Sequence, residues 1–63
     1  MPIANLLILE GRTAHDKQEL IRAVTAAIVD TLGVKPESVR IIVHEVQKEN
    51  WGIGGVSARE LGK

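Results

Sequence analysis

The fold is decided by Ile3–Val46, IANLLILEGRTAHDKQELIRAVTAAIVDTLGVKPESVRIIVHEV. This stretch opens with Ile3–Leu9, a short aliphatic run closed by Gly11, which is typical of a β-strand. It ends with Val39–Val46, whose β-branched residues predict a second strand. A helix between two strands predicts a βαβ unit, in which the strands are parallel and the crossover is right-handed.

The segment between the two strands carries the signals of one helix. Thr13 is a suitable N-cap, and Asp16 places a negative charge in the first turn, where the helix dipole favours it. Gly33 supplies the stop, and Pro36–Ser38 predicts a turn into the second strand. The apolar residues that recur at three- and four-residue spacing are Leu20, Ile21, Val24, Ala27, Ile28 and Leu32. The residues expected mostly on the other, solvent side are Lys17, Glu19, Arg22, Thr25, Ala26 and Asp30.

The remainder of the chain predicts only short elements. Asn50–Gly55 (NWGIGG) is too rich in glycine for a long regular element and predicts a loop or hairpin. Ser57–Leu61 is expected to form a last short helical turn. No linker or internal repeat divides the chain, so residues 1–63 are expected to form a single domain of the α/β (α+β) class.

One helix covers only one face of a sheet, and two strands alone are unstable. The first strand is apolar on both faces apart from Asn5, which indicates burial on both sides. The second strand places Val39, Ile41, Val43 and Glu45 on one face and Arg40, Ile42, His44 and Val46 on the other. A cysteine-free chain of 63 residues has a small core and no disulfide to support it. Other copies of the chain are therefore expected to cover the second face.

The composition excludes several classes of function. Eight basic and eight acidic residues cancel, so the positive field that draws proteins to nucleic acid is missing. Trp51 is the only aromatic residue, too few for a base-stacking surface. No apolar run reaches the roughly 20 residues of a membrane span, and no basic leading region suggests a signal peptide. His15 and His44 lie far apart in a chain without cysteine and make a poor metal set. These features predict a cytoplasmic protein that binds neither nucleic acid nor membranes.

Pro2 follows an initiator methionine, which is normally removed before a small residue such as proline. Removal leaves a secondary amine, whose pKa would be lowered by burial and by nearby cations. An amine with a pKa near the operating pH is a good general base. The simpler interpretation is a proline that leads into a strand, where its missing N–H is tolerated. Position alone favours the simpler interpretation.

Two arginines and the tryptophan are further candidates. Arg40 interrupts the aliphatic run VRIIV, and Arg12 follows Gly11. The guanidinium fork suits carboxylates and polarises an adjacent carbonyl. A salt bridge between subunits is an equal alternative for Arg40, and a solvated loop charge is the preferred one for Arg12 taken alone. Trp51 either walls an apolar pocket or fills a subunit interface, where tryptophan is enriched, and the interface is the better choice for a single residue.

Taken together, these segments resemble the 4-oxalocrotonate tautomerase family, the short-chain type of the tautomerase superfamily. The resemblance covers nearly the whole chain and rests on MPIANLLILEGR, KQELIRAVTAAI, VKPESVRIIVHEV and WGIGG. It implies a βαβ subunit assembled as a homohexamer, a trimer of dimers, in which the dimer sheets join into four strands. It also implies that Pro2, with Met1 removed, is the base that moves a proton within an enol acid such as 2-hydroxymuconate. No cofactor or metal is expected.

The resemblance also assigns roles to other residues, which different subunits contribute. The arginine matching Arg12 holds the distal carboxylate of the substrate. The one matching Arg40 binds the proximal carboxylate and the 2-oxygen, and it stabilises the charge that develops there. Trp51 matches an apolar wall that is usually phenylalanine. Leu9 and Ser38 match positions that line the site, Ser38 through its backbone.

Two alternatives stay open beside the isomerase. On the same scaffold, a protonated terminal proline would assist hydration, dehalogenation or decarboxylation of an unsaturated acid. Hydration needs an acid that activates water, and Glu45 is expected on the face opposite Arg40, which disfavours it. The other alternative is a ring-forming scaffold without catalysis, which needs neither arginine nor the proline. The tail Leu61–Lys63 lacks the arginine that approaches the site in some members of the family.

Overall fold

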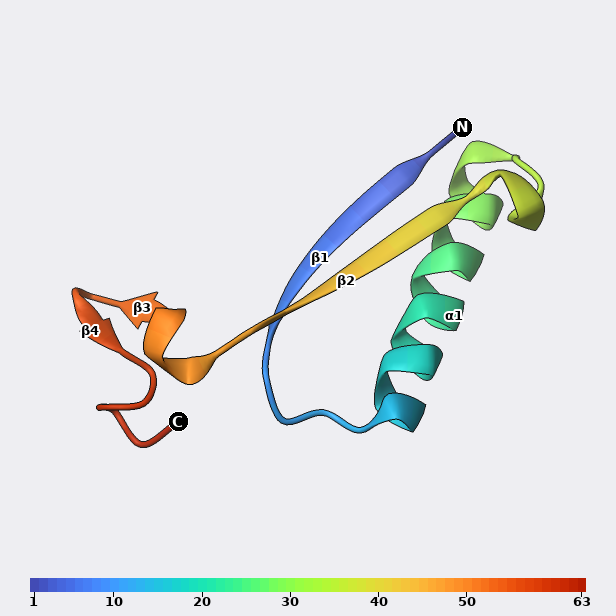
Figure 1. The fold of residues 1–63 in the computed structure, drawn as a ribbon. Coiled ribbons are helices and arrows are strands. Elements are labelled where there is room, and N and C mark those ends of the chain that lie inside the picture. The colour runs from blue at the N-terminus through green and yellow to red at the C-terminus, as the bar shows by residue number, and fades with distance from the viewer.

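The computed structural model describes all residues, 1–63. Two strands precede and follow one long helix in the chain and lie together on one side of it, and two 3₁₀ turns and a short hairpin complete the chain (Figure 1). The elements in order are β1 (Ile3–Leu9), α1 (Ala14–Leu32), the 3₁₀ turn η1 (Pro36–Ser38), β2 (Arg40–Val46), the 3₁₀ turn η2 (Lys48–Asn50), β3 (Gly52–Ile53) and β4 (Val56–Ser57). No helix has both the length and the apolar content needed to cross a membrane.

β1 and β2 pair in parallel, which confirms the predicted βαβ unit. The register places Ile3 beside Arg40 at one end and Leu9 beside Val46 at the other. β2 begins at Arg40, so the prediction that it begins at Val39 was wrong by one residue. The N–H of Val39 donates to the carbonyl of Pro36 at 3.1 Å and closes the η1 turn, so it is not available to a strand ladder.

α1 begins and ends where the sequence predicts. The hydroxyl of Thr13 accepts a hydrogen bond from the N–H of Asp16 at 3.0 Å, which satisfies one of the unpaired donors of the first turn. Gly33 takes a left-handed conformation (φ 68°), and its N–H donates to the carbonyl of Val29 at 2.9 Å. Glycine adopts this conformation without the steric cost that other residues pay.

The covered side of α1 differs slightly from the prediction. Ala27 and Leu32, which were expected on the covered side, are exposed, whereas Thr25, which was expected on the solvent side, is half-buried. The half-buried residues of the helix are Lys17, Leu20, Ile21, Val24, Thr25, Ile28 and Val29. The predicted stripe was therefore right for Leu20, Ile21, Val24 and Ile28 and wrong for Ala27 and Leu32. Helical spacing alone does not fix how far a helix is rotated against its sheet.

The two faces of the β1–β2 pair have different surroundings, as predicted. The face toward α1 carries half-buried aliphatic side chains: Ala4, Leu6, Ile8, Ile41 and Val43. The other face leaves Ile3, Leu7 and Ile42 exposed by 60%, 64% and 45%. Only Val39 and Ala58 are buried in the single chain. Most of the apolar surface that would form a core is therefore not covered within one chain.

The C-terminal part forms a hairpin beyond the carboxyl ends of β1 and β2 (Figure 1). β3 and β4 pair in antiparallel fashion, and Gly54 and Gly55 connect them with φ values of 60° and 88°, as a two-residue hairpin turn requires. This confirms the predicted hairpin. Asn50 belongs instead to η2. A single helical turn then follows β4, closed by the N–H of Leu61 donating to the carbonyl of Ser57 at 3.1 Å.

Candidate active site

A hollow of about 520 Å³ opens between the end of β1, the first turns of α1 and the segment that follows η2. Its lining is mostly apolar with three charged side chains: Leu7, Ile8, Leu9, Arg12, Asp16, Lys17, Leu20 and Trp51. An apolar concavity with a few converging polar groups is the usual form of a small-molecule site. The hollow brings together three of the predicted site residues, Leu9, Arg12 and Trp51.

Arg12 reaches this hollow because the chain turns sharply after β1. Gly11 has a φ of 114°, which lies in the region that favours glycine, and it redirects the chain from the strand toward the helix. Arg12 then precedes the helix cap Thr13. Its side chain is exposed and takes part in no hydrogen bond or ion pair within the chain.

Trp51 is held at the hollow by main-chain contacts on both sides. Its N–H donates to the carbonyl of Lys48 at 3.4 Å, which closes η2. Its carbonyl accepts from the N–H of Ala58 at 2.7 Å, and Ala58 is fully buried. The half-buried indole thus stands at the junction between the C-terminal hairpin and the βαβ unit.

Pro2, Ser38 and Arg40 form a second group at the opposite end of the strand pair. The N–H of Arg40 donates to the carbonyl of Pro2 at 3.0 Å. The hydroxyl and the N–H of Ser38 both donate to the carbonyl of Lys35, at 2.8 and 3.0 Å. The guanidinium of Arg40 donates to the carbonyls of Glu37 and Val39 at 2.7 and 3.2 Å.

The two groups are too far apart within one chain to meet on one small molecule. β1 has seven residues and separates Pro2 from the Leu9 end of the hollow, a span of roughly 20 Å at the rise of a β-strand. A six-carbon acid is far shorter than this span. If all six predicted residues serve one site, at least two chains must contribute to it.

The arginines of the chain divide into two kinds. Arg22 lies 3.1 Å from a carboxylate oxygen of Glu19, and Arg59 lies 2.9 Å from one of Glu49. Arg12 and Arg40 have no carboxylate partner. The predicted substrate arginines are therefore the two without a carboxylate partner. One nitrogen of Arg40, Nη1, bonds to main-chain carbonyls, and its other guanidinium nitrogens make no bond within the chain.

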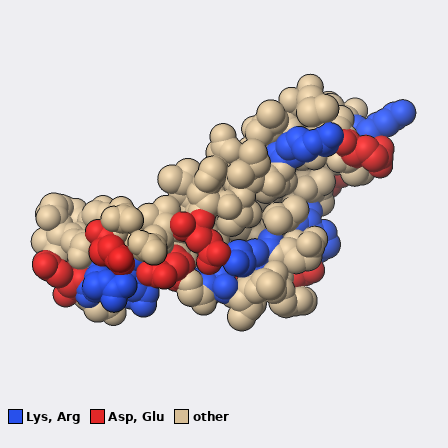
Figure 2. Space-filling view, in the orientation of Figure 1, with Lys and Arg blue, Asp and Glu red and all other residues tan.

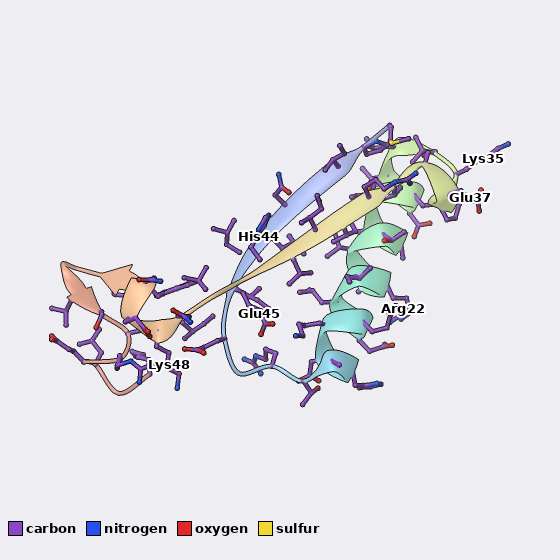
Figure 3. The ribbon with its side chains drawn as sticks, in the orientation of Figure 1. Arg22, Lys35, Glu37, His44, Glu45 and Lys48 are labelled. Carbon is purple, nitrogen blue, oxygen red and sulfur yellow. The ribbon has the colours of Figure 1, made fainter.

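The acidic and histidine side chains offer no alternative centre. Glu45 lies on the side of β2 toward α1, where its carboxylate is 2.7 Å from the ammonium group of Lys17 (Figure 3). This places Glu45 on the face opposite Arg40, as predicted. His44 is exposed on the outer face, and His15 is exposed in the first turn of α1. Neither histidine belongs to a group of side chains that would hold a metal ion.

Sequence reasoning missed two charged residues of the hollow, Asp16 and Lys17. Lys17 was expected on the solvent side of the helix, but it is half-buried and bonded to Glu45 across 28 positions in the sequence. The available signal was its place in the first turn of α1, five positions after Arg12. Because α1 starts shortly after β1 ends, the first turn of α1 lies near the end of β1, and both line the hollow.

Charged side chains gather over the hairpin end of the molecule and also lie in the lower middle and at the opposite end, whereas the upper middle of the view carries none (Figure 2). The hydrogen bond from Arg59 lowers the pKa of the Glu49 carboxyl below its ordinary value of 4.5. The same bond raises the pKa of Arg59 above its ordinary value. Both groups are exposed, so solvent screens the pair and its effect on stability is small.

Known proteins match this chain in sequence and in structure over nearly its full length. The family model described as Tautomerase enzyme matches residues 2–60. A 2-hydroxymuconate tautomerase from Comamonas testosteroni is 49% identical over 63 residues, the whole of both chains. A 4-oxalocrotonate tautomerase isozyme from Methylibium petroleiphilum superimposes with a TM-score of 0.96 at 48% identity, covering 98% of this chain and 100% of that one. A heterohexamer 4-oxalocrotonate tautomerase from Chloroflexus aurantiacus gives a TM-score of 0.92 at 39% identity, covering 97% and 98%. These matches identify the βαβ chain, with its hollow and its two unpaired arginines, as a member of the tautomerase family of enzymes.

Proposed function

We propose that this protein is an isomerase that converts the enol form of a small conjugated dicarboxylic acid, such as 2-hydroxymuconate, into its keto form. The observation that carries the proposal is the pair Arg12 and Arg40, the two arginines without a carboxylate partner in a chain related to 2-hydroxymuconate tautomerases over its full length. Two cations suit a substrate with two carboxylates.

The site is assembled from several copies of the chain, in a homohexamer built as a trimer of dimers with four-stranded dimer sheets. Three observations support this assembly. Pro2 and Arg40 lie at one end of the strand pair, and Arg12 lies at the other. The outer sheet face leaves Leu7 64% exposed, and only two residues of the chain are buried. A related solved structure is a heterohexamer.

Pro2 is the general base once Met1 has been removed. Its secondary amine takes the proton from the 2-hydroxyl group, and the electron pair moves through the conjugated system. The amine then returns the proton to a distant carbon, so the reaction is a net isomerisation that needs no co-reactant. Arg40 binds the proximal carboxylate and the 2-oxygen, where its charge stabilises the developing negative charge. Arg12 holds the distal carboxylate.

The remaining residues shape the site. Trp51 and Leu9 supply an apolar wall, which lowers the local dielectric and disfavours the protonated form of the proline amine. Ser38 lines the site near Arg40, and its hydroxyl is engaged by the carbonyl of Lys35. The backbone of Ser38 is therefore the part proposed to face the substrate.

The alternatives have less support. Hydration of an unsaturated acid needs a carboxylate that activates water, but Glu45 faces α1 and is paired with Lys17 at 2.7 Å. A scaffold without catalysis gives no reason for two arginines to lack carboxylate partners in a chain with eight acidic residues.

Ultraviolet absorbance tests the proposal, because ketonisation shortens the conjugated system. The protein should accelerate ketonisation of 2-hydroxymuconate and act less well on the matching monocarboxylic enol. Pro2→Ala should lower turnover by roughly 10²- to 10⁴-fold, the range typical of a general base, without dissociating the oligomer. No acceleration by the unaltered protein, or full turnover by an intact Pro2→Ala oligomer, would contradict the proposal.

A further inference from the structure

Glu10 lies in the chain between Leu9 and Arg12, two residues that line the hollow. It follows β1 directly, and its N–H donates to the carbonyl of Val46 at 2.9 Å, which extends the ladder one step beyond β1. Arg12 stands two positions later, in the segment that leads to α1. The main chain of Glu10 is therefore fixed to the sheet, and the sheet end fixes the start of the Arg12 segment.

The side chain of Glu10 bonds to the segment that precedes Trp51. Its carboxylate oxygen Oε2 accepts a hydrogen bond of 2.8 Å from the N–H of Lys48, the first residue of η2. The carbonyl of Lys48 in turn accepts from the N–H of Trp51 at 3.4 Å. The carboxylate thus caps the short turn that carries the tryptophan, and an N–H bonded to an ionised acceptor makes one of the stronger hydrogen bonds in proteins.

No other side chain makes this connection. The side-chain bonds and ion pairs between residues 47–63 and the rest of the chain are the bond to Lys48 and the approach of Arg59 to Glu10 at 3.9 Å, and both involve Glu10. The hairpin otherwise continues from β2 and is held internally, as by the N–H of Ala58 bonding to the carbonyl of Trp51. Removal of the Glu10 carboxylate would leave the orientation of Trp51 to the main chain alone.

We propose that Glu10 is a positioning residue, which sets the placement of Trp51 relative to Arg12 and thereby the affinity of the site for its substrate. The role in catalysis rests on the proposed function, whereas the effect on Trp51 does not. Glu10 acts through its acceptor oxygen rather than through its charge on the substrate, because that oxygen is engaged by Lys48. Substrate affinity should therefore depend on the hydrogen bond.

The chain contains one tryptophan, so its fluorescence reports on Trp51 alone. In Glu10→Ala we expect a shift of the emission maximum and faster quenching by acrylamide, measured on the assembled protein without substrate. The KM for 2-hydroxymuconate should rise about tenfold, the effect of losing one hydrogen bond to a charged group. Glu10→Gln retains a carbonyl oxygen that can accept from Lys48, and it should restore the emission and most of the affinity.

Glu49→Ala is the matched control. It removes the other carboxylate beside Arg59 but leaves the bond between Glu10 and Lys48 intact, so emission and KM should stay those of the unaltered protein. Unchanged emission in an assembled Glu10→Ala protein would overturn the proposal. If Glu10→Ala does not fold, Glu10→Gln decides: native emission supports a hydrogen-bond role, and altered emission overturns it. Absence of tautomerase activity in the unaltered protein would affect only the proposed function, since the emission arm needs no turnover.

Discussion

The N–H of Arg40 donates a 3.0 Å hydrogen bond to the carbonyl of Pro2, so the proposed base and the proposed charge-stabilising arginine are neighbours in one chain. The strand register is the cause, because Ile3 pairs with Arg40 and leaves Pro2 just beyond the paired region. Arg12 and Trp51 lie at the other end of the same strands. Under the proposed mechanism, this arrangement makes the activity of the protein depend on how its chains assemble.

Removal of Met1 is the first condition of the proposed mechanism. Intact-protein mass spectrometry should give a mass lower than that of the full sequence by one methionine residue. Met1 must be removed because a retained Met1 would turn the Pro2 nitrogen into an amide, which has no basic lone pair. A protein that retains Met1 in full and still turns over substrate would contradict the role of Pro2.

Substitution of the two arginines should impair different kinetic constants. Arg40→Ala should lower kcat by roughly 10²- to 10³-fold, because it removes the cation that stabilises charge formed during proton transfer. Arg12→Ala should mainly raise KM, by about tenfold, since it removes a contact present before and during the reaction. Steady-state kinetics of both variants checks the pair, with Arg22→Ala as a control arginine already paired with Glu19. A reversed pattern would mean that the two roles are misassigned.

Mixed assemblies test whether one site uses several chains. Arg12→Ala and Arg40→Ala should each have low activity alone. The two variants are unfolded together and then allowed to reassemble. Some sites should then receive Arg12 from one variant and Arg40 from the other, and part of the activity should return. Each variant taken through the same procedure alone serves as the control. No recovery in assembled mixtures would indicate that a single chain supplies both arginines to each site.

The Glu49–Arg59 pair predicts a pH dependence of stability. Because the pKa of Glu49 is lowered, chiefly by the hydrogen bond from Arg59, the folded state gains stability at pH values above the ordinary value of 4.5. This gain is lost as the pH falls through the lowered pKa. Urea unfolding should therefore show a small difference between the unaltered protein and Glu49→Gln at neutral pH, which closes in acid. A difference that widens in acid would contradict the assignment.

The cap of α1 should contribute measurably to folding. Thr13→Ala removes the hydroxyl that accepts from Asp16, and it should lower the free energy of unfolding by about 1 kcal/mol per chain. Thr13→Ser retains the hydroxyl and should have little effect. Thermal unfolding at a fixed chain concentration makes the comparison, because the stability of an assembling protein depends on concentration. Equal stability of the alanine and serine variants would show that the cap is not needed.

Much of the fold was predictable because its signals are local. Thr13 and Gly33 mark the ends of α1 through bonds within three or four residues, and the strand faces follow from alternation along the chain. The errors had two different causes. Val39 joined the η1 turn through a local bond to Pro36, which prevailed over its preference for a strand, whereas Lys17 was drawn to Glu45 by a contact across the helix–sheet interface.

The sequence by itself determined the βαβ order, the helix ends and the six candidate site residues, since these depend on local periodicity, capping and motif. Only the tertiary structure decided which candidates lie together. Parallel register places Pro2 beside Arg40, whereas the turn at Gly11 and the bond to Lys48 bring Arg12 and Trp51 to the same hollow. The physical reason is that register and hydrogen bonds between distant segments follow from packing in three dimensions, which spacing along the chain does not specify.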